Sequence, residues 1–235
     1  MILKNRVAIV TGAGSGIGRA GARIMAREGA TVCVADRDEA RAGETVDLIR
    51  TDGGTAEAVI LDVTDDMELK MAIAGVLSRH GRIDILHNHA GAQIAGDLEE
   101  VSLDGLDLSW NLNVRAHLMA ARLVMPAMKA QGKGVILNTS SSSGVLYDRE
   151  MIAYTTTKHA VIAMTKQMAG DYARHGIRVN ALCPGWVDTP FNAPFIDQMG
   201  GRGAIEGYIS EKVPMGRWAD VEEIAEPILF LVSDR

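Results

Sequence analysis

Cysteine, proline and aromatic residues are scarce in this sequence of 235 residues, which has two cysteines, six prolines and 4% aromatic residues. Cys33 and Cys183 lie in separate apolar segments that are typical of strands, so no disulfide framework is indicated, and a reducing, cytoplasmic location fits. No run approaches the roughly 18 consecutive apolar residues of a membrane span. The apolar stretch that a signal peptide needs does not follow Lys4 and Arg6, so we also expect no signal peptide.

Clusters of basic residues are missing as well. The formal net charge is −6, and binding to a nucleic-acid backbone needs clustered Lys and Arg. The sequence therefore predicts no nucleic-acid partner. Apolar residues are plentiful at 47%, and there are 25 glycines. At this length such a composition is typical of a globular chain with a large core.

Short β-branched runs alternate with longer helical patterns. The runs VAIV and VILN are continuously apolar, which is typical of a parallel sheet buried on both faces. Without repeats or a domain boundary, this alternation predicts an α/β fold, a single Rossmann-type doubly wound parallel sheet flanked by helices, over residues 1–235. The predicted strands are 6–11, 31–36, 55–62, 83–88, 135–139 and 177–182. The predicted helices are 16–28, 39–52, 65–80, 114–131, 153–175 and 220–232.

The segment 191–217 interrupts this alternation and is rich in Gly, Pro and Met. Ligands of doubly wound sheets bind beyond the carboxyl ends of the strands, so we interpret this insert as a substrate lid. A packed surface excursion is the alternative. Asp220 and Glu223 predict a capping pair for the last helix, and Pro227 should kink it. No strand pattern follows before Arg235, so we expect either a chain truncated there or a sheet that lacks a last C-terminal strand.

A glycine-rich turn, TGAGSGIG at residues 11–18, joins the first strand to the first helix. Such a turn lets the backbone approach a pyrophosphate, and the helix N-terminus offers it free N–H groups. Asp36 and Asp62 end the second and third strands, where the ribose and adenine of a dinucleotide are expected. A purely structural turn, with two solvated acids, is the alternative.

Tyr154 and Lys158 lie one turn apart on one face of the predicted helix 153–175. A nearby ammonium favours the phenolate over a phenol of pKa near about 10, so the tyrosine could take a hydroxyl proton while hydride leaves the carbon. Tyr208 and Lys212 have the same spacing. Only Tyr154 has a serine, Ser141, thirteen residues before it and at the end of a strand.

In this order and spacing, these residues resemble the short-chain dehydrogenase/reductase family over essentially the whole chain. The resemblance also rests on NHAG at residues 88–91 and PGWVDT at residues 184–189. It implies that Tyr154 is the acid/base and that Ser141 orients the substrate oxygen. Lys158 would bind the nicotinamide ribose and lower the tyrosine pKa. Asn113 would hold a water of the proton relay, with Asn111 as its rival.

The same resemblance implies an oxidoreductase that moves hydride between a nicotinamide cofactor and an alcohol or ketone. Thr189 and the Val187 backbone would contact the nicotinamide carboxamide. The residues expected to contact the cofactor are Gly12, Ser15, Gly16, Ile17, Gly18, Asp36, Asp62, Val63, Asn88, Ala90, Gly91, Tyr154, Lys158, Pro184, Gly185, Val187 and Thr189.

The expected cofactor is NAD. The Asp36 carboxylate can accept hydrogen bonds from both ribose hydroxyls of NAD, whereas it would repel the extra phosphate of NADP. NADP-preferring relatives usually carry a basic residue where Ser15 stands. Arg37 is the complication, because it could meet that phosphate.

Two positions depart from the family pattern or suggest other chemistry. His89 replaces the usual second Asn, and no role is carried onto it. His87 and His89 point to one side of a strand, but without Cys or acidic neighbours they predict no metal site.

Two other functions fit the sequence less well. A methyltransferase would leave Ser141, Tyr154 and Lys158 as coincidence, and an idle NAD-binding regulator would typically lose the Tyr or the Lys. The family resemblance leaves the substrate open. The segment 108–119 and the insert resemble those of members that act on hydroxy acids or sugar-derived acids, so a sugar, a sugar acid or a hydroxy acid is expected. Arg149, Arg202 or Arg217 could meet a substrate carboxylate, and the alternative is that each is a solvated surface charge.

A homo-oligomer, either a dimer or a tetramer, is also expected. The predicted helices 114–131 and 153–175 carry small and apolar residues around their whole circumference. One apolar stripe of each helix packs on the sheet, and a partner subunit could cover the apolar stripe that faces away from it. The alanines concerned are Ala116, Ala120, Ala121, Ala160 and Ala163.

Overall fold

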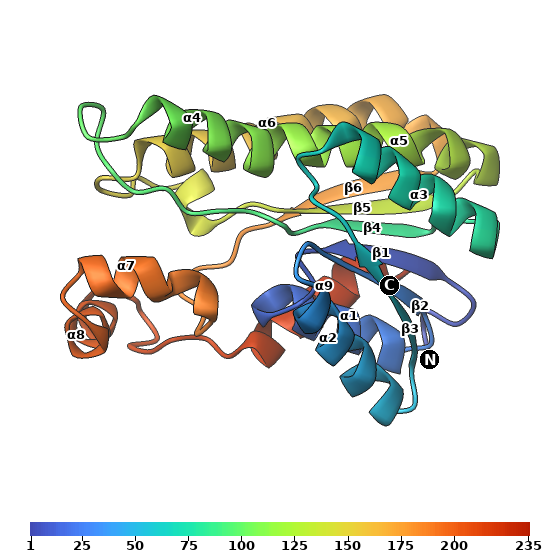
Figure 1. Cartoon of the computed structure of the whole chain (residues 1–235), viewed down its shortest axis with the longest axis horizontal. Coiled ribbons are helices and arrows are strands. Elements are labelled where there is room, and N and C mark those ends of the chain that lie inside the picture. The colour runs from blue at the N-terminus through green and yellow to red at the C-terminus, as the bar shows by residue number, and fades with distance from the viewer.

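A six-stranded parallel sheet runs through the centre of the computed structural model, which describes residues 1–235 apart from the side chain of Pro194 (Figure 1). The strand order is β3-β2-β1-β4-β5-β6. The strands are β1 (Val7–Thr11), β2 (Thr31–Asp36), β3 (Thr55–Ile60), β4 (Ile85–Asn88), β5 (Gly134–Thr139) and β6 (Ile177–Leu182). Every residue of β1, β4 and β5 is buried, as continuously apolar strands predict. The predicted doubly wound α/β fold is confirmed.

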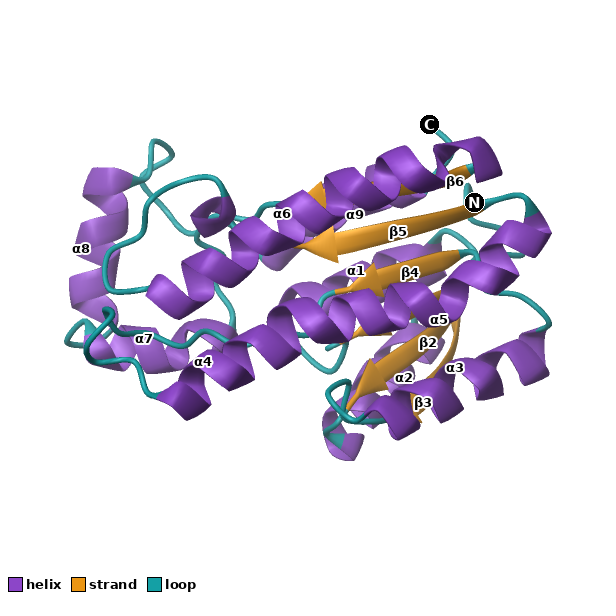
Figure 2. Ribbon diagram, turned by 90° about the horizontal axis from the view of Figure 1, so that it is seen from above, coloured by secondary structure: helices purple, strands orange, loops and turns teal.

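Helices cover both faces of the sheet (Figures 1 and 2). One face packs against α1 (Gly16–Arg27), α2 (Glu39–Thr51) and α9 (Val221–Val232). The other packs against α3 (Asp66–His80), α5 (Ala116–Gln131) and α6 (Ile152–Tyr172). Each face therefore has its own apolar cluster, and the sheet separates the two. None of the helices described is both long enough and apolar enough to cross a membrane.

Three helices of the described chain were not predicted: α4 (Leu103–Trp110), α7 (Ala193–Gln198) and α8 (Arg202–Lys212). The predicted helix over 114–131 is preceded by α4, and a π-helical turn over Asn111–Arg115 joins the two. In that turn the N–H of Ala116 donates to the carbonyl of Asn111. A π-turn adds one residue to a helical turn without leaving a pattern in the sequence, and it is common at functional sites. The other predicted ends differ by three residues or fewer.

The segment 191–217 is helical rather than irregular. Figure 2 shows α7 and α8 beyond the arrowheads of the strands, apart from the two helical layers. The buried residues Ile205, Ile209 and Trp218 form a third, small core beneath them. Farther along, the predicted cap of α9 is confirmed, because Glu223 accepts a hydrogen bond of 2.8 Å from the Asp220 N–H.

The crossover connections diverge between β1 and β4. The chain moves from β1 to β2 and β3 on one side, then returns to β4 and continues to β6 on the other. A crevice forms at the carboxyl ends of the strands at such a switch point, and ligands of doubly wound sheets bind there.

Candidate active site

A cavity of about 370 Å³ opens at this switch point. Most of the residues singled out from the sequence line it: Gly12, Ser15, Gly16, Ile17, Asp36, Asp62, Val63, Ala90, Gly91, Ser141, Tyr154, Lys158, Pro184, Gly185, Val187 and Thr189. Gly18, Asn88 and Asn113 are not among the lining residues described, and they lie behind the cavity wall.

The glycine turn closes tightly because two glycines leave room for it. Gly12 has a φ of 66°, which disfavours other residues. A Cβ on Gly18 would lie 2.2 Å from the carbonyl oxygen of Gly12, closer than atoms can approach. The turn therefore brings the first turn of α1 to the cavity. No described side chain caps this helix end at Ser15. Its N–H groups thus fit the pyrophosphate of a dinucleotide.

The carboxylate of Asp36 is fixed at the far end of the cavity. It accepts a hydrogen bond of 2.8 Å from the N–H of Gly14 and one of 3.0 Å from the N–H of Asp38. Arg37, which is exposed, lines the same end. Asp62 also lies there, where the Thr64 hydroxyl and the Arg37 charge lower its pKa. Two carboxylates and one guanidinium thus line the end of the cavity where the adenosine half of the cofactor is expected.

Tyr154, Ser141 and Lys158 meet at the other end of the cavity. Tyr154 is 6% exposed and Lys158 is 3% exposed, and the Lys158 ammonium lies 5.5 Å from the centre of the phenol ring. It donates a hydrogen bond of 3.0 Å to the Thr139 carbonyl. Burial lowers the pKa of Lys158 to about 8. At neutral pH the amine is therefore still charged.

The tyrosine pKa shifts in the direction opposite to the one that the resemblance implies. Burial raises the pKa of Tyr154 to about 12; the Ser141 hydroxyl opposes this rise, and the Asp148 charge adds to it. The protein's own groups therefore keep the phenol protonated at neutral pH. A protonated phenol is the form that can donate a proton to a carbonyl oxygen.

Asn113 lies in the π-turn and is completely buried. Its amide nitrogen donates to the Ala92 carbonyl at 2.9 Å and to the Thr157 hydroxyl at 3.1 Å. Its amide oxygen accepts from the Ala92 N–H at 2.9 Å. The side chain thus ties the loop after β4 to α6, one residue before Lys158. Its rival Asn111 is exposed.

Asn88 and His87 of β4, and His89 directly after it, make hydrogen bonds within the sheet. The Asn88 amide donates to the side chain of Asn138 at 2.9 Å within the sheet. His87 and His89 both contact the Thr139 hydroxyl, at 2.9 and 3.2 Å. Burial lowers the pKa of His89 to about 4, so the ring is neutral. Among the described residues, neither histidine belongs to a group of three metal-ligand side chains.

Sequence reasoning missed several residues that line the substrate end. Gln93 and Asp148 are its polar additions, and Leu108, Leu112 and Phe191 are apolar ones. The amide oxygen of Gln93 is buried without a hydrogen-bond partner in the described structure. Their positions in the sequence are the one signal that could have identified them. Gln93 lies in the loop after β4, and Asp148 lies between Ser141 and Tyr154.

The second Tyr/Lys pair lies away from the cavity. Tyr208 is on α8, 39% exposed, with its ring 6.0 Å from that of Trp186. Lys212 pairs with the neighbouring Glu211. Neither is among the described lining residues, whereas Tyr154 and Lys158 both line the cavity.

The three arginines considered for a substrate carboxylate are engaged elsewhere. None is among the cavity-lining residues that the structure describes. Their partners are carboxylates of the chain: Arg149 pairs with Glu150, Arg202 with Asp188, and Arg217 with Glu223.

Comparison with known proteins agrees with this geometry. The chain is 38% identical over 234 residues to 2,5-dichloro-2,5-cyclohexadiene-1,4-diol dehydrogenase of Sphingobium indicum, covering 99% of this chain and 91% of that protein. It is 34% identical over 233 residues to cyclohexanol dehydrogenase of Acinetobacter sp., covering 98% and 88%. A crystal structure of a gluconate 5-dehydrogenase from Burkholderia cenocepacia, in complex with NADP and tartrate, superimposes with a TM-score of 0.91 at 33% identity, covering 98% and 89%.

The family model described as short chain dehydrogenase matches residues 6–200. This match spans the glycine turn, the Tyr154 and Lys158 pair and the segment after β6. It leaves no room for the methyltransferase alternative. The chain belongs to the short-chain dehydrogenase family of oxidoreductases.

Proposed function

We propose that the protein is an NAD-dependent enzyme that moves a hydride between the nicotinamide ring and the carbon of a secondary alcohol or ketone. The observation that carries the proposal is that Ser141, Tyr154 and Lys158 line the same cavity as the glycine turn and Asp36. A dinucleotide with its adenosine ribose at Asp36 and its pyrophosphate at the glycine turn would extend toward Tyr154. Thr189 and Val187 would then lie beside the nicotinamide.

Each residue of this end has a role in the proposed reaction. Tyr154 exchanges a proton with the substrate oxygen, and Ser141 orients that oxygen by a hydrogen bond. The bound cofactor supplies the hydride acceptor or donor and, when oxidised, a positive ring that favours the phenolate. Lys158 holds a charge close to the phenol and offers its remaining N–H groups to the cavity. Asn113 holds the loop after β4 against α6 and would bind a water molecule of the proton relay.

We further propose that the substrate is a neutral alcohol or ketone rather than a sugar acid. Among the described residues at the substrate end, Lys158 is the one that carries a positive charge. Its ammonium lies 5.5 Å from the centre of the Tyr154 ring. Asp148 lies close enough to raise the pKa of Tyr154, so it would repel a substrate carboxylate. Leu108, Leu112 and Phe191 supply apolar surface. Two of the relatives of this chain are named as dehydrogenases of a cyclic diol and of a cyclic alcohol.

Segment 191–217 contributes Phe191 to this end, with its ring 6.3 Å from that of Tyr154. We interpret the segment as the substrate lid of a single domain over residues 1–235. Its pairing of Arg202 with Asp188 anchors α8 to the segment after β6.

A panel of neutral and acidic substrates tests the substrate charge: cyclohexanol and 1,2-cyclohexanediol against gluconate and tartrate, each with NAD, followed by nicotinamide absorbance. We expect turnover of the neutral alcohols. Asp148→Asn should shift the kcat/KM ratio toward the acids by about tenfold, as removal of one nearby like charge predicts. Glu150→Gln, two residues away at the surface, is the matched control and should leave the ratio unchanged. Wild-type preference for gluconate or tartrate would show that the substrate is an acid.

We also propose that the chain forms a homodimer or homotetramer through α5 and α6. Ala116, Ala120 and Ala121 are buried within the chain, whereas Ala163 on α6 is exposed and Ala160 is half-buried. Leu118 on α5 is 41% exposed. A partner subunit would cover this apolar surface. Multi-angle light scattering at micromolar concentration should give a dimer or tetramer mass; a monomer mass would contradict the proposal.

A further inference from the structure

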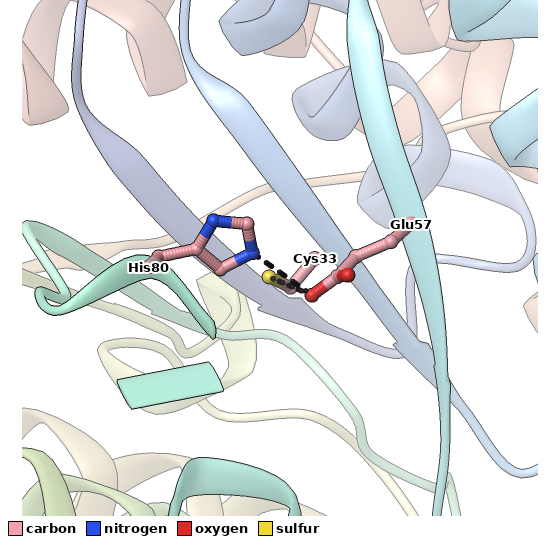
Figure 3. Close-up of side chains that lie close together, drawn as sticks. All are labelled: Cys33, Glu57 and His80. Atoms are coloured by element: carbon pink, nitrogen blue, oxygen red, sulfur yellow. Dashed lines mark hydrogen bonds and ion pairs between the residues drawn. The ribbon is translucent and has the colours of Figure 1, made fainter. Parts of the chain in front are cut away.

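Cys33, Glu57 and His80 come together (Figure 3). They lie on the side of the sheet that α3 covers, and none is among the described cavity-lining residues. Cys33 on β2 and Glu57 on β3 are register partners, so their side chains share a face of the sheet. His80 is the last residue of α3. The carboxylate oxygen Oε1 of Glu57 lies 3.3 Å from Cys33 Sγ and 3.1 Å from His80 Nε2. The three ligand atoms all lie within 4.8 Å of one another.

These separations suit a tetrahedral metal ion. Zinc bonds of about 2.3 Å to sulfur and about 2.0 Å to nitrogen and oxygen place neighbouring ligand atoms roughly 3.3–3.5 Å apart. The observed sulfur–oxygen and nitrogen–oxygen distances are within a few tenths of an ångström of these values. We propose that Cys33, Glu57 and His80 bind a borderline-soft divalent cation, with Zn²⁺ as the type ion and water as its fourth ligand.

The charges and the access to solvent fit this ion. Burial raises the pKa of the Cys33 thiol, so without a cation the thiolate does not form. Burial alone would also raise the pKa of Glu57, but hydrogen bonds from Arg79, His80 and Cys33 hold it at about 2, so this ligand is already ionised. A divalent cation would displace the thiol proton, and the two anionic ligands would balance its charge. Glu57 and His80 are about a quarter exposed, which gives the ion and its water a path.

Arg79 limits the affinity of this site. Its Nη2 donates to Oε1 of Glu57 at 2.7 Å and its Nε to Oε2 at 3.1 Å. An ion on Oε1 would replace the first bond and leave the second, and the guanidinium would stay nearby as a like charge. The competing interpretation is that Glu57 simply accepts hydrogen bonds from three donors. An Arg79 variant separates the two interpretations, because loss of the guanidinium should tighten metal binding only if the metal site exists.

The bound ion would join β2, β3 and α3 at the edge of the sheet. None of its three ligands is among the cavity-lining residues described, so the proposal is independent of the proposed reaction. The sequence did not suggest this site, because the ligands come from three separate elements and follow no metal-binding spacing.

Spectroscopic titration of the full chain, purified with chelator and kept reduced, tests the proposal. Co²⁺ should bind with one equivalent and give visible ligand-field bands with a thiolate-to-cobalt band in the near ultraviolet. Zn²⁺ should displace it and, by calorimetry in two buffers, release about one proton. Cys33→Ser should abolish the thiolate band, while Cys183→Ser, the matched control, should retain it. His80→Gln should weaken binding at least about tenfold, and Arg79→Gln should tighten it.

Several results would overturn the site. They are a wild-type chain without the thiolate band, a band that depends on Cys183, or unchanged Co²⁺ affinity in both His80→Gln and Arg79→Gln. His80 and Arg79 lie at the surface end of α3, so these variants keep the test decisive if Cys33→Ser fails to fold. Thermal melts of each variant with and without Zn²⁺ provide the folding check, and the wild-type melting temperature should rise with the ion.

Discussion

Tyr154→Phe should lower turnover by at least about 10²-fold, the scale of general acid–base catalysis. The substitution removes the hydroxyl that exchanges the proton and keeps the ring, which lies 6.3 Å from that of Phe191. The cavity should therefore keep its shape, and NADH should still bind with nearly unchanged affinity. Steady-state turnover with an alcohol of the substrate panel, together with NADH fluorescence, separates the two effects.

Tyr208→Phe is the matched control, because Tyr208 precedes a lysine by the same spacing but lies on α8 beside Trp186. It should cost far less than tenfold in turnover. Equal losses in the two variants would refute the assignment of Tyr154. A wild-type chain that binds NADH but turns over none of the panel would instead favour the idle regulator.

The kcat/KM for NAD should exceed that for NADP by at least a hundredfold. The two backbone N–H groups of Gly14 and Asp38 fix both oxygens of the Asp36 carboxylate, so it cannot swing away from an incoming phosphate. Such a phosphate carries roughly −1.5 to −2 charge. Like charges in a partly desolvated site cost several kcal/mol, which corresponds to about two or more powers of ten. Initial rates with both cofactors and one alcohol give the ratio.

Arg37 is the residue that could reverse this preference. It is exposed, lines the cavity and could meet the phosphate, and the similar gluconate 5-dehydrogenase holds NADP. Asp36→Ala should therefore weaken use of NAD and improve use of NADP. Arg37→Gln, its neighbouring control, should affect NADP alone. A wild-type ratio near one, or one that favours NADP, would mean that Arg37 outweighs Asp36.

The sheet, its flanking helices and the glycine turn could be predicted because each follows from local pattern. Apolar runs specify buried strands, and Gly12 before α1 and Gly18 in its first turn approach each other too closely for a side chain at Gly18. The π-turn over Asn111–Arg115 could not be predicted, since a change from i+4 to i+5 bonding leaves periodicity nearly unaltered. The helices α7 and α8 were missed because Gly and Pro masked short apolar patterns that pack on Trp218.

The sequence indicated most of the residues that line the candidate site, but not the direction in which the pKa of Tyr154 shifts. Position in the chain identified Tyr154, Ser141 and Lys158, which line one cavity. The direction of the tyrosine pKa required the degree of burial and the charge of Asp148, and both depend on how distant segments pack. Gln93 was missed for the same reason, since its unpartnered oxygen appears only in the folded chain.

The buried charge of Lys158 lowers the stability of the fold, and this cost matters for proteins that evolve from this one and no longer need its activity. At pH 7 the folded chain holds a charged amine where burial lowers its pKa to about 8, and the unfolded chain solvates that charge better. The resulting loss of stability is full below pH 8 and fades as the pH rises toward the ordinary lysine value of 10.5. Drift should therefore replace this lysine with an uncharged side chain once catalysis is no longer required. A lineage that kept the glycine turn and lost the amine would gain stability while still binding nucleotides.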